Sequence, residues 1–175
     1  MSNLPVRQHP VNESAPDSGL ESSRQTPART PAGDAFSGLV VRLFRLNGLI
    51  AAEGETLARP AGQSTARWQV LASVEGAPVT VATIARTLGL ARQSVQRVAD
   101  ALEAGGLISY EDNPRHRRAR LVTLTADGRS ALARIQAEQR PWANALGAAV
   151  GERELLKATS ALDRVLAVMT ERRSR

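Results

Sequence analysis

The chain contains no cysteine, and this absence removes several classes of function. Disulfide bonds, thiolate catalysis, thiol redox sensing and cysteine-ligated zinc sites are all excluded. The only imidazoles are those of His9 and His116, so a conventional metal centre is not expected either. The sequence therefore predicts a protein without a metal and without a cofactor.

Long apolar runs and aromatic residues are also scarce. We find no run of about 18 apolar residues that would span a membrane, and the N-terminus lacks the basic-then-apolar order of a signal peptide. These observations favour a cytoplasmic protein. Aromatic residues make up only 3% of the chain, which disfavours RNA binding because unpaired bases stack on aromatic rings. A Gly-rich phosphate loop and a nucleophile motif are missing as well, so an enzyme is not expected.

Positive charge is what the chain has in excess. The net charge is +6, and 22 of the 23 basic residues are arginine. Arginine suits phosphate and guanine binding because its planar guanidinium donates two parallel hydrogen bonds. A genome whose base composition favours arginine codons would raise the same count, so the positions of the arginines matter more than their number.

Residues 1–33 differ in composition from the segments 34–60 and 126–172, which have a helical pattern. Residues 1–33 hold five of the nine prolines and little apolar clustering, which predicts a disordered N-terminal tail. Apolar residues recur at helical spacing over 34–60, with Asp34 as the expected N-cap, and again over 126–172. Pro141 should kink or split the helical pattern there.

The central part, 64–125, has the order helix, tight turn, helix and β-hairpin. Thr80 opens a short helix that ends at Gly89, and a second helix follows over ARQSVQRVADALEAGGL, with Gly105 and Gly106 as its left-handed cap. Strands over 107–110 and 120–124 then flank a basic turn. This order is that of a winged helix-turn-helix. The predicted fold class is therefore mainly α with a small β-hairpin, in which the DNA-binding head lies between N- and C-terminal dimerisation helices.

The second helix of the central part has a polar face that suits the major groove of DNA. Arginine pairs with guanine O6 and N7, glutamine pairs with adenine N6 and N7, and serine can donate to a phosphate. The residues predicted to contact DNA from this helix are Arg92, Gln93, Ser94, Gln96 and Arg97. The alternative is an ordinary exposed helix face, because arginine and glutamine are good helix formers.

The basic turn favours the DNA interpretation. A charged hairpin tip beside such a helix would follow the minor groove, whose negative potential attracts arginine. The residues predicted to contact DNA from the turn are Arg115, His116, Arg117 and Arg118. Taken by itself, a charge run of this kind is usually a solvated turn.

The run TIARTLGLARQSVQRVADALEAGGLI, followed by NPRHRRARLVTLTADG, resembles the MarR family of bacterial transcription regulators over about residues 35–172. The resemblance implies a homodimer with intertwined terminal helices and a small, often aromatic or phenolic ligand that releases the protein from its operator. The family's wing commonly carries Asp-x-Arg, and here His116 replaces the aspartate while Arg118 matches the arginine. We expect His116 either to contact DNA directly or to face solvent.

The terminal helices have apolar faces longer than a small head requires, and the simplest partner for them is a second copy of the chain. The expected interface residues are Phe36, Leu39, Leu43, Leu155, Leu162, Leu166 and Met169. The alternative is that the two helices pair within one chain. A two-fold dimer would bind a pseudo-palindromic operator with half-sites roughly 10 bp apart.

The resemblance also implies a ligand pocket lined by the first, second and fifth helices. The residues predicted there are Phe44, Asn47, Trp68, Arg140 and Trp142, with Arg45 as a further cation for a carboxylate or phenolate. Ordinary core packing is the alternative for each aromatic side chain.

Together these features predict a nucleoid-associated, homodimeric repressor that binds double-stranded DNA and is released by a small ligand. An architectural DNA-binding protein without an effector is the first alternative, and it would show low sequence preference and a steep salt dependence. A protein-interaction module is the second, but it would leave the arginines of the turn unexplained.

Overall fold

The computed structural model describes residues 28–116 and 118–173, and the chain divides into two compact units, Met1–Val40 and Val41–Arg175. Helix α1 (Pro31–Ala58) begins in the first unit and continues into the second. Most of the predicted tail lies outside the described residues, but its last three residues form the first turn of α1. The predicted N-cap, Asp34, is wrong: the Thr30 hydroxyl accepts from the Gly33 N–H at 3.1 Å, and Pro31 suits the first helical position.

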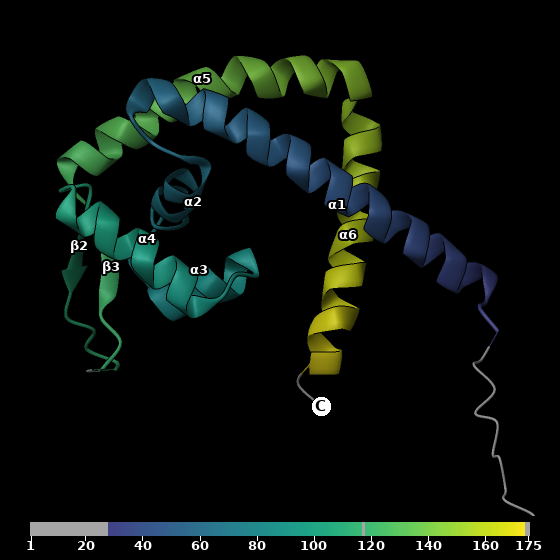
Figure 1. The fold of residues 1–175 in the computed structure, drawn as a ribbon, viewed down its shortest axis with the longest axis horizontal. Coiled ribbons are helices and arrows are strands. Elements are labelled where there is room, and N and C mark those ends of the chain that lie inside the picture. The colour runs from purple at the N-terminus through teal and green to yellow at the C-terminus, as the bar shows by residue number, and fades with distance from the viewer. Residues whose placement is uncertain (1–27, 117, 174–175) are drawn as a thin grey trace, which may run out of the picture. The chain divides into compact units, whose positions relative to one another are not determined.

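The second unit continues with a 3-10 turn, η1 (Arg59–Ala61), and five helices (Figure 1). The helices are α2 (Thr65–Ser73), α3 (Val81–Leu88), α4 (Arg92–Ala104), α5 (Ala126–Val150) and α6 (Glu152–Arg173). The side chains of Ser64, Thr80 and Thr125 accept hydrogen bonds from backbone N–H groups at the starts of α2, α3 and α5. The cap at Thr80 confirms the predicted start of the short helix in the central part.

Pro141 was predicted to kink or split the helix, and α5 runs unbroken through it, so the split is excluded. A proline removes only one backbone donor. The turns on either side keep their own hydrogen bonds and hold the helix together. Figure 1 shows α5 leaving the sheet and leading to α6.

The sheet has three antiparallel strands rather than the two of the predicted hairpin. Strand β1 (Val79–Thr80) pairs with β3 (Leu121–Leu124), which pairs in turn with β2 (Ile108–Glu111). A two-residue strand is too short to show an alternating pattern, so β1 could not be predicted from its residues. The hairpin of β2, β3 and their connecting turn is called the wing below.

The core of the second unit forms where α2, α3 and α4 pack on the sheet. Leu71, Ala99 and Leu102 have no exposed surface, and they come from α2 and α4. The other buried members of this core are Val70, Val74, Val81, Ile84, Ala85, Val95, Ile108, Val122 and Leu132. Because α4 turns its apolar face inward here, its polar face must lie outside.

Two glycines fix the backbone at the end of α4 and at the start of α5. Gly106 has φ 72°, and the bonds Gly106 N–H to Glu103 O and Leu107 N–H to Leu102 O close the predicted left-handed cap. A Cβ on Gly128 would lie 1.9 Å from the Leu107 carbonyl oxygen, so only glycine fits there. The start of α5 is thereby held against the start of β2.

Candidate DNA-binding surface

The side chains on the polar face of α4 form two rows along the helix. Gln93 and Arg97 are exposed, and the Arg97 guanidinium lies 3.5 Å from Ser94 Oγ. Arg92, Gln96 and Asp100 follow each other at intervals of four residues and line a cavity between α4 and the wing. The structure thus brings the five predicted α4 residues to one helix surface, but only some of them face the wing.

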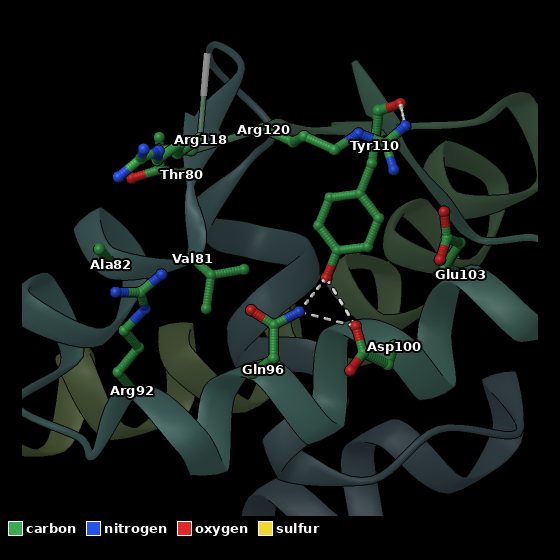
Figure 2. Close-up of a pocket in the computed structure, with 11 residues that line it drawn as sticks. Thr80, Val81, Ala82, Arg92, Gln96, Asp100, Glu103, Tyr110, Arg118 and Arg120 are labelled. Carbon is green, nitrogen blue, oxygen red and sulfur yellow. Dashed lines mark hydrogen bonds between the residues drawn. The ribbon is translucent and has the colours of Figure 1, made fainter. Parts of the chain in front are cut away.

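The cavity has a volume of about 340 Å³ and carries both signs of charge (Figure 2). Arg118 and Arg120 of the wing and Arg92 of α4 are among its lining residues, as are Asp100 and Glu103. Arg92 and Arg118, both predicted to contact DNA, therefore border the same hollow although 26 positions separate them in sequence.

Gln96, Asp100 and Tyr110 form a closed set of hydrogen bonds, called the triad below (Figure 2). Gln96 Nε2 lies 2.7 Å from Asp100 Oδ1 and 2.8 Å from Tyr110 Oη. The Tyr110 hydroxyl donates to the same Asp100 oxygen at 2.9 Å. The triad ties α4 to strand β2, and no role had been predicted from the sequence for Asp100 or Tyr110. Only the spacing of four residues between Gln96 and Asp100 could have indicated part of it.

Tyr110 is also held from its other side. The Arg120 guanidinium donates to the Tyr110 carbonyl oxygen, and its central carbon lies 5.2 Å from the centre of the phenol ring. This distance is in the range of a cation–π interaction. Arg120 thereby connects the end of the basic turn to the middle of β2.

The turn of the wing is shaped by Asn113. Its side-chain oxygen accepts from the Arg115 N–H at 3.0 Å, and its Nδ2 donates to the Ala119 carbonyl at 2.9 Å. The side chains of Arg115, His116 and Arg118 are exposed, while Arg117 lies outside the described residues. Asn113 therefore spans the turn that the family's aspartate would brace from position 116.

A second cavity, of about 390 Å³, lies between α1, α2 and the end of α3. Trp68 is one of its lining residues, together with Ile50, Gly54, Thr65, Gln69, Ala72, Ser73 and Leu88. Phe44, Asn47 and Arg140 are exposed in the single chain, and Trp142 is half-buried. Of the five predicted pocket residues, the structure thus brings only Trp68 to this cavity.

Large apolar side chains remain exposed on α1 and α6 of the single chain. Phe44 is 75% exposed, Leu166 61% and Met169 52%. The other exposed apolar residues on the second-unit part of α1 and on α6 are Val41, Leu46, Leu49, Ile50, Leu155, Leu156 and Val168. Leu43 and Leu162 are half-buried, and Phe36 and Leu39 lie in the first unit.

The segment Pro31–Ala61 is also long and apolar enough to cross a membrane, by length and composition alone.

Among the described residues, no group of three or more His, Asp or Glu side chains could hold a metal ion.

The triad predicts an unusual titration for Tyr110, the only tyrosine of the chain. Burial, and then the hydrogen bond and negative charge of Asp100, raise the pKa of Tyr110 to about 12. The neutral phenol is thus favoured by folding. Its contribution to stability is complete below the ordinary pKa near 10 and is lost as the pH rises through about 12.

Phenolate absorbance should therefore rise with a midpoint near pH 12 in the folded protein. Asp100→Asn should move the midpoint part of the way towards 10, because burial remains. Circular dichroism at each pH verifies that the chain is still folded. A midpoint near 10 in folded wild-type protein would contradict the triad.

Comparison with known proteins places this surface in a family. The family model described as "MarR family" matches residues 62–119, from before α2 to the turn of the wing. The uncharacterised Mycobacterium tuberculosis protein Rv2011c is 37% identical over 140 residues, which cover 80% of this chain and 98% of that protein. The transcriptional activatory protein BadR of Rhodopseudomonas palustris is 30% identical over 95 residues, or 52% of this chain and 54% of that protein.

Solved structures share the fold at lower identity. An E. coli MarR mutant in complex with operator DNA superposes with a TM-score of 0.60 at 22% identity, covering 73% of this chain and 95% of that chain. CouR from Rhodococcus jostii RHA1, bound to p-coumaroyl-CoA, gives 0.66 at 20%, covering 73% and 90%. The predicted winged helix fold is confirmed, and the extent of the match to Rv2011c exceeds the head alone. The chain belongs to the MarR family of DNA-binding transcription regulators.

Proposed function

We propose that the chain is a homodimeric, sequence-specific repressor that binds double-stranded DNA through α4 and the wing and is released by a small ligand. The observation that carries the proposal is the shared cavity between Arg92 of α4 and Arg118 of the wing. A helix that enters the major groove and a hairpin that follows the next minor groove must both present cations to the same stretch of DNA. Arg92 and Arg118 do so from α4 and from the wing, on the border of one cavity.

The roles within the surface follow from exposure. Gln93 and Arg97 are exposed on α4 and can reach base edges, since arginine suits guanine and glutamine suits adenine. Ser94 lies at the start of α4, where free backbone N–H groups favour a phosphate. Arg115 and His116 lie at the exposed tip of the wing. These contacts position the protein on the DNA backbone.

The dimer proposal rests on the apolar faces of α1 and α6. If the two helices covered each other within one chain, Phe44 and Leu166 would not both be more than half exposed. A second copy would cover these faces by the same residues in both subunits. A membrane would also cover the apolar face of α1. Burying Arg45, Asn47 and Glu53 of this helix in lipid is costly, however, which disfavours this alternative.

The ligand proposal rests on the cavity beside Trp68. A volume of about 390 Å³ lies in the range of small-molecule sites, and Ile50 and Leu88 give it apolar walls. It lies between α1 and the head, so a ligand there could change how the head is held. CouR, which shares the fold, was solved with p-coumaroyl-CoA, and an aromatic ligand is the class that we propose.

Activation of transcription is an alternative to repression, because the relative BadR is named a transcriptional activatory protein. A non-specific DNA-binding protein without an effector is the remaining alternative. It would use the same cations but would give equal affinity for all sequences.

The proposed operator binding is tested by footprinting on the DNA upstream of the chain's own gene. Wild-type protein should protect a discrete, two-fold symmetric site, because two α4 helices related by the dimer axis bind two half-sites. The double variant Arg92→Ala/Arg97→Ala should lose that protection, since both base and backbone contacts are removed.

A matched control, Arg59→Ala/Arg134→Ala, removes the same charge from exposed positions outside α4 and the wing. It should protect the site like wild type. Diffuse protection that is the same for all three proteins would support the non-specific alternative. A protected site that overlaps the promoter would indicate repression. A protected site upstream of the promoter would indicate activation.

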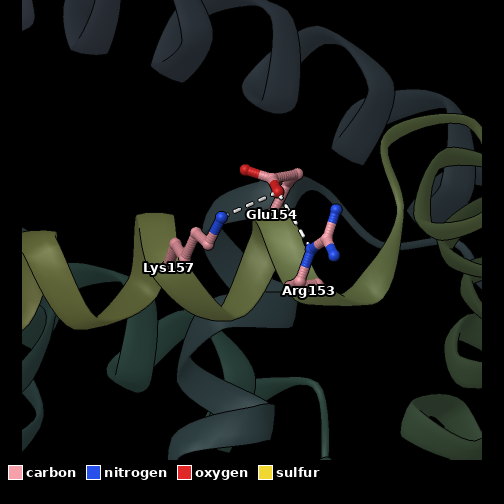
Figure 3. A network of polar contacts seen from close by, with 3 residues as sticks. All are labelled: Arg153, Glu154 and Lys157. Carbon is pink, nitrogen blue, oxygen red and sulfur yellow. Dashed lines mark hydrogen bonds and ion pairs between the residues drawn. The ribbon is translucent and has the colours of Figure 1, made fainter.

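The dimer is tested by a charge placed on the apolar face of α6. Leu166→Asp should shift the protein from twice the mass of one chain to a single chain in sedimentation, because a buried carboxylate without a partner is strongly disfavoured. Ser160→Asp places the same charge on the exposed polar side of α6, where Arg153, Glu154 and Lys157 form surface ion pairs (Figure 3). It should remain dimeric. A wild-type protein that sediments as one chain refutes the dimer.

A further inference from the structure

The chemistry of the triad fixes which group donates each hydrogen bond. The Asp100 carboxylate has acceptors only, so Gln96 must turn its NH₂ group towards it and Tyr110 must give it the hydroxyl proton. The Tyr110 oxygen then accepts the second N–H of Gln96. The NH₂ group of Gln96 is therefore turned to two acceptors inside the protein.

The amide oxygen of Gln96 points into the cavity. Figure 2 shows it turned away from Asp100 and Tyr110, towards the part of the cavity where Arg92 and Val81 lie. An unrestrained glutamine binds adenine with two bonds, donating to N7 and accepting from the N6 amino group. Held by the triad, Gln96 lacks the donor for N7 and can only accept.

We propose that Asp100 and Tyr110 set the base preference of the DNA-binding surface by holding Gln96 as a hydrogen-bond acceptor. In this state Gln96 favours a base with an amino group in the major groove, which is cytosine or adenine. Guanine and thymine present only acceptors there and are disfavoured. Asp100 and Tyr110 are positioning residues, since they act through Gln96. The inference rests on the proposed function, because it requires α4 to lie in the major groove.

The test starts from an operator selected from random duplexes with the full-length wild-type protein. Each base pair of the operator is then replaced in turn, and affinities are measured for wild type, Gln96→Ala, Tyr110→Phe and Ser109→Ala. Gln96→Ala identifies the base pair that Gln96 contacts. Ser109→Ala is the matched control: it removes a hydroxyl from the adjacent position of β2, where Ser109 pairs with Thr123 at 2.8 Å and not with the triad.

At the pair identified by Gln96→Ala, wild type should bind operators with cytosine or adenine on the strand that Gln96 contacts roughly 2- to 12-fold more tightly than operators with guanine or thymine there, the effect of one net hydrogen bond. Tyr110→Phe frees one N–H of Gln96 for adenine N7. The preference for adenine over cytosine should therefore rise by a similar factor, while Ser109→Ala keeps the wild-type profile. Asp100→Ala removes the carboxylate that holds the Gln96 NH₂ group and the Tyr110 hydroxyl together, so the amide can turn and offer an N–H beside its oxygen to adenine N7. It should shift the preference in the same direction, which covers the case that Tyr110→Phe does not fold.

Three results would overturn the inference and leave the proposed function standing. Gln96→Ala could change discrimination at no pair, wild type could prefer guanine or thymine at that pair, or both triad variants could keep the wild-type profile. If the selection enriches no sequence, or if Arg92→Ala/Arg97→Ala binds the selected operator like wild type, the proposed function fails and the inference fails with it.

Discussion

The burial of one face of α4 is the constraint on which the DNA-binding surface depends. Val95, Ala99 and Leu102 are buried against α2, α3 and the sheet, so α4 cannot rotate without exposing them. Removing a valine or leucine side chain such as those of Val95 and Leu102 from water contributes about 1.5–3 kcal/mol. Each turn of α4 therefore has a fixed inner side, and the arginines and glutamines have a fixed outer side.

The wing is oriented by contacts to the same helix rather than by its own hairpin alone. The triad joins β2 to α4, and Arg120 joins the turn of the wing to Tyr110. Strand β3 is paired on both sides, by β2 and by β1. A change in α4 would thus be felt in the wing through Tyr110, which makes this tyrosine the link between the two DNA-contacting elements that we propose.

Much of the fold was predictable because its signals are local. Ser64, Thr80 and Thr125 cap helices through bonds to residues three positions later, and Gly106 ends α4 in a left-handed conformation. Other features depend on partners far along the chain. Tyr110 reaches Asp100 across ten positions, and β1 exists only because β3 pairs with it. The start of α1 was misplaced because Thr30 and Asp34 are both suitable caps, and Pro31 decided between them.

For the candidate site, too, the features with local signals were predictable and those that depend on distant partners were not. Residue types and the basic turn indicated the segments that we propose to contact DNA, but the sequence did not show that Gln96 faces the wing while Gln93 and Arg97 face outward. The expected ligand pocket was placed by resemblance, and of its predicted residues only Trp68 lines a cavity. Whether a side chain points into a cavity depends on helix rotation, which the packing of the whole unit determines.

The central claim is that α4 recognises base sequence and does not merely bind the charge of DNA. The most direct measurement compares the affinity of wild-type protein for its selected operator and for a scrambled duplex of equal length and composition over a range of salt concentrations. Both affinities should fall with salt, because phosphate contacts release counterions. The operator should still bind at least about 10³-fold more tightly at physiological salt. Equal affinities for the two duplexes at every salt concentration would contradict the account.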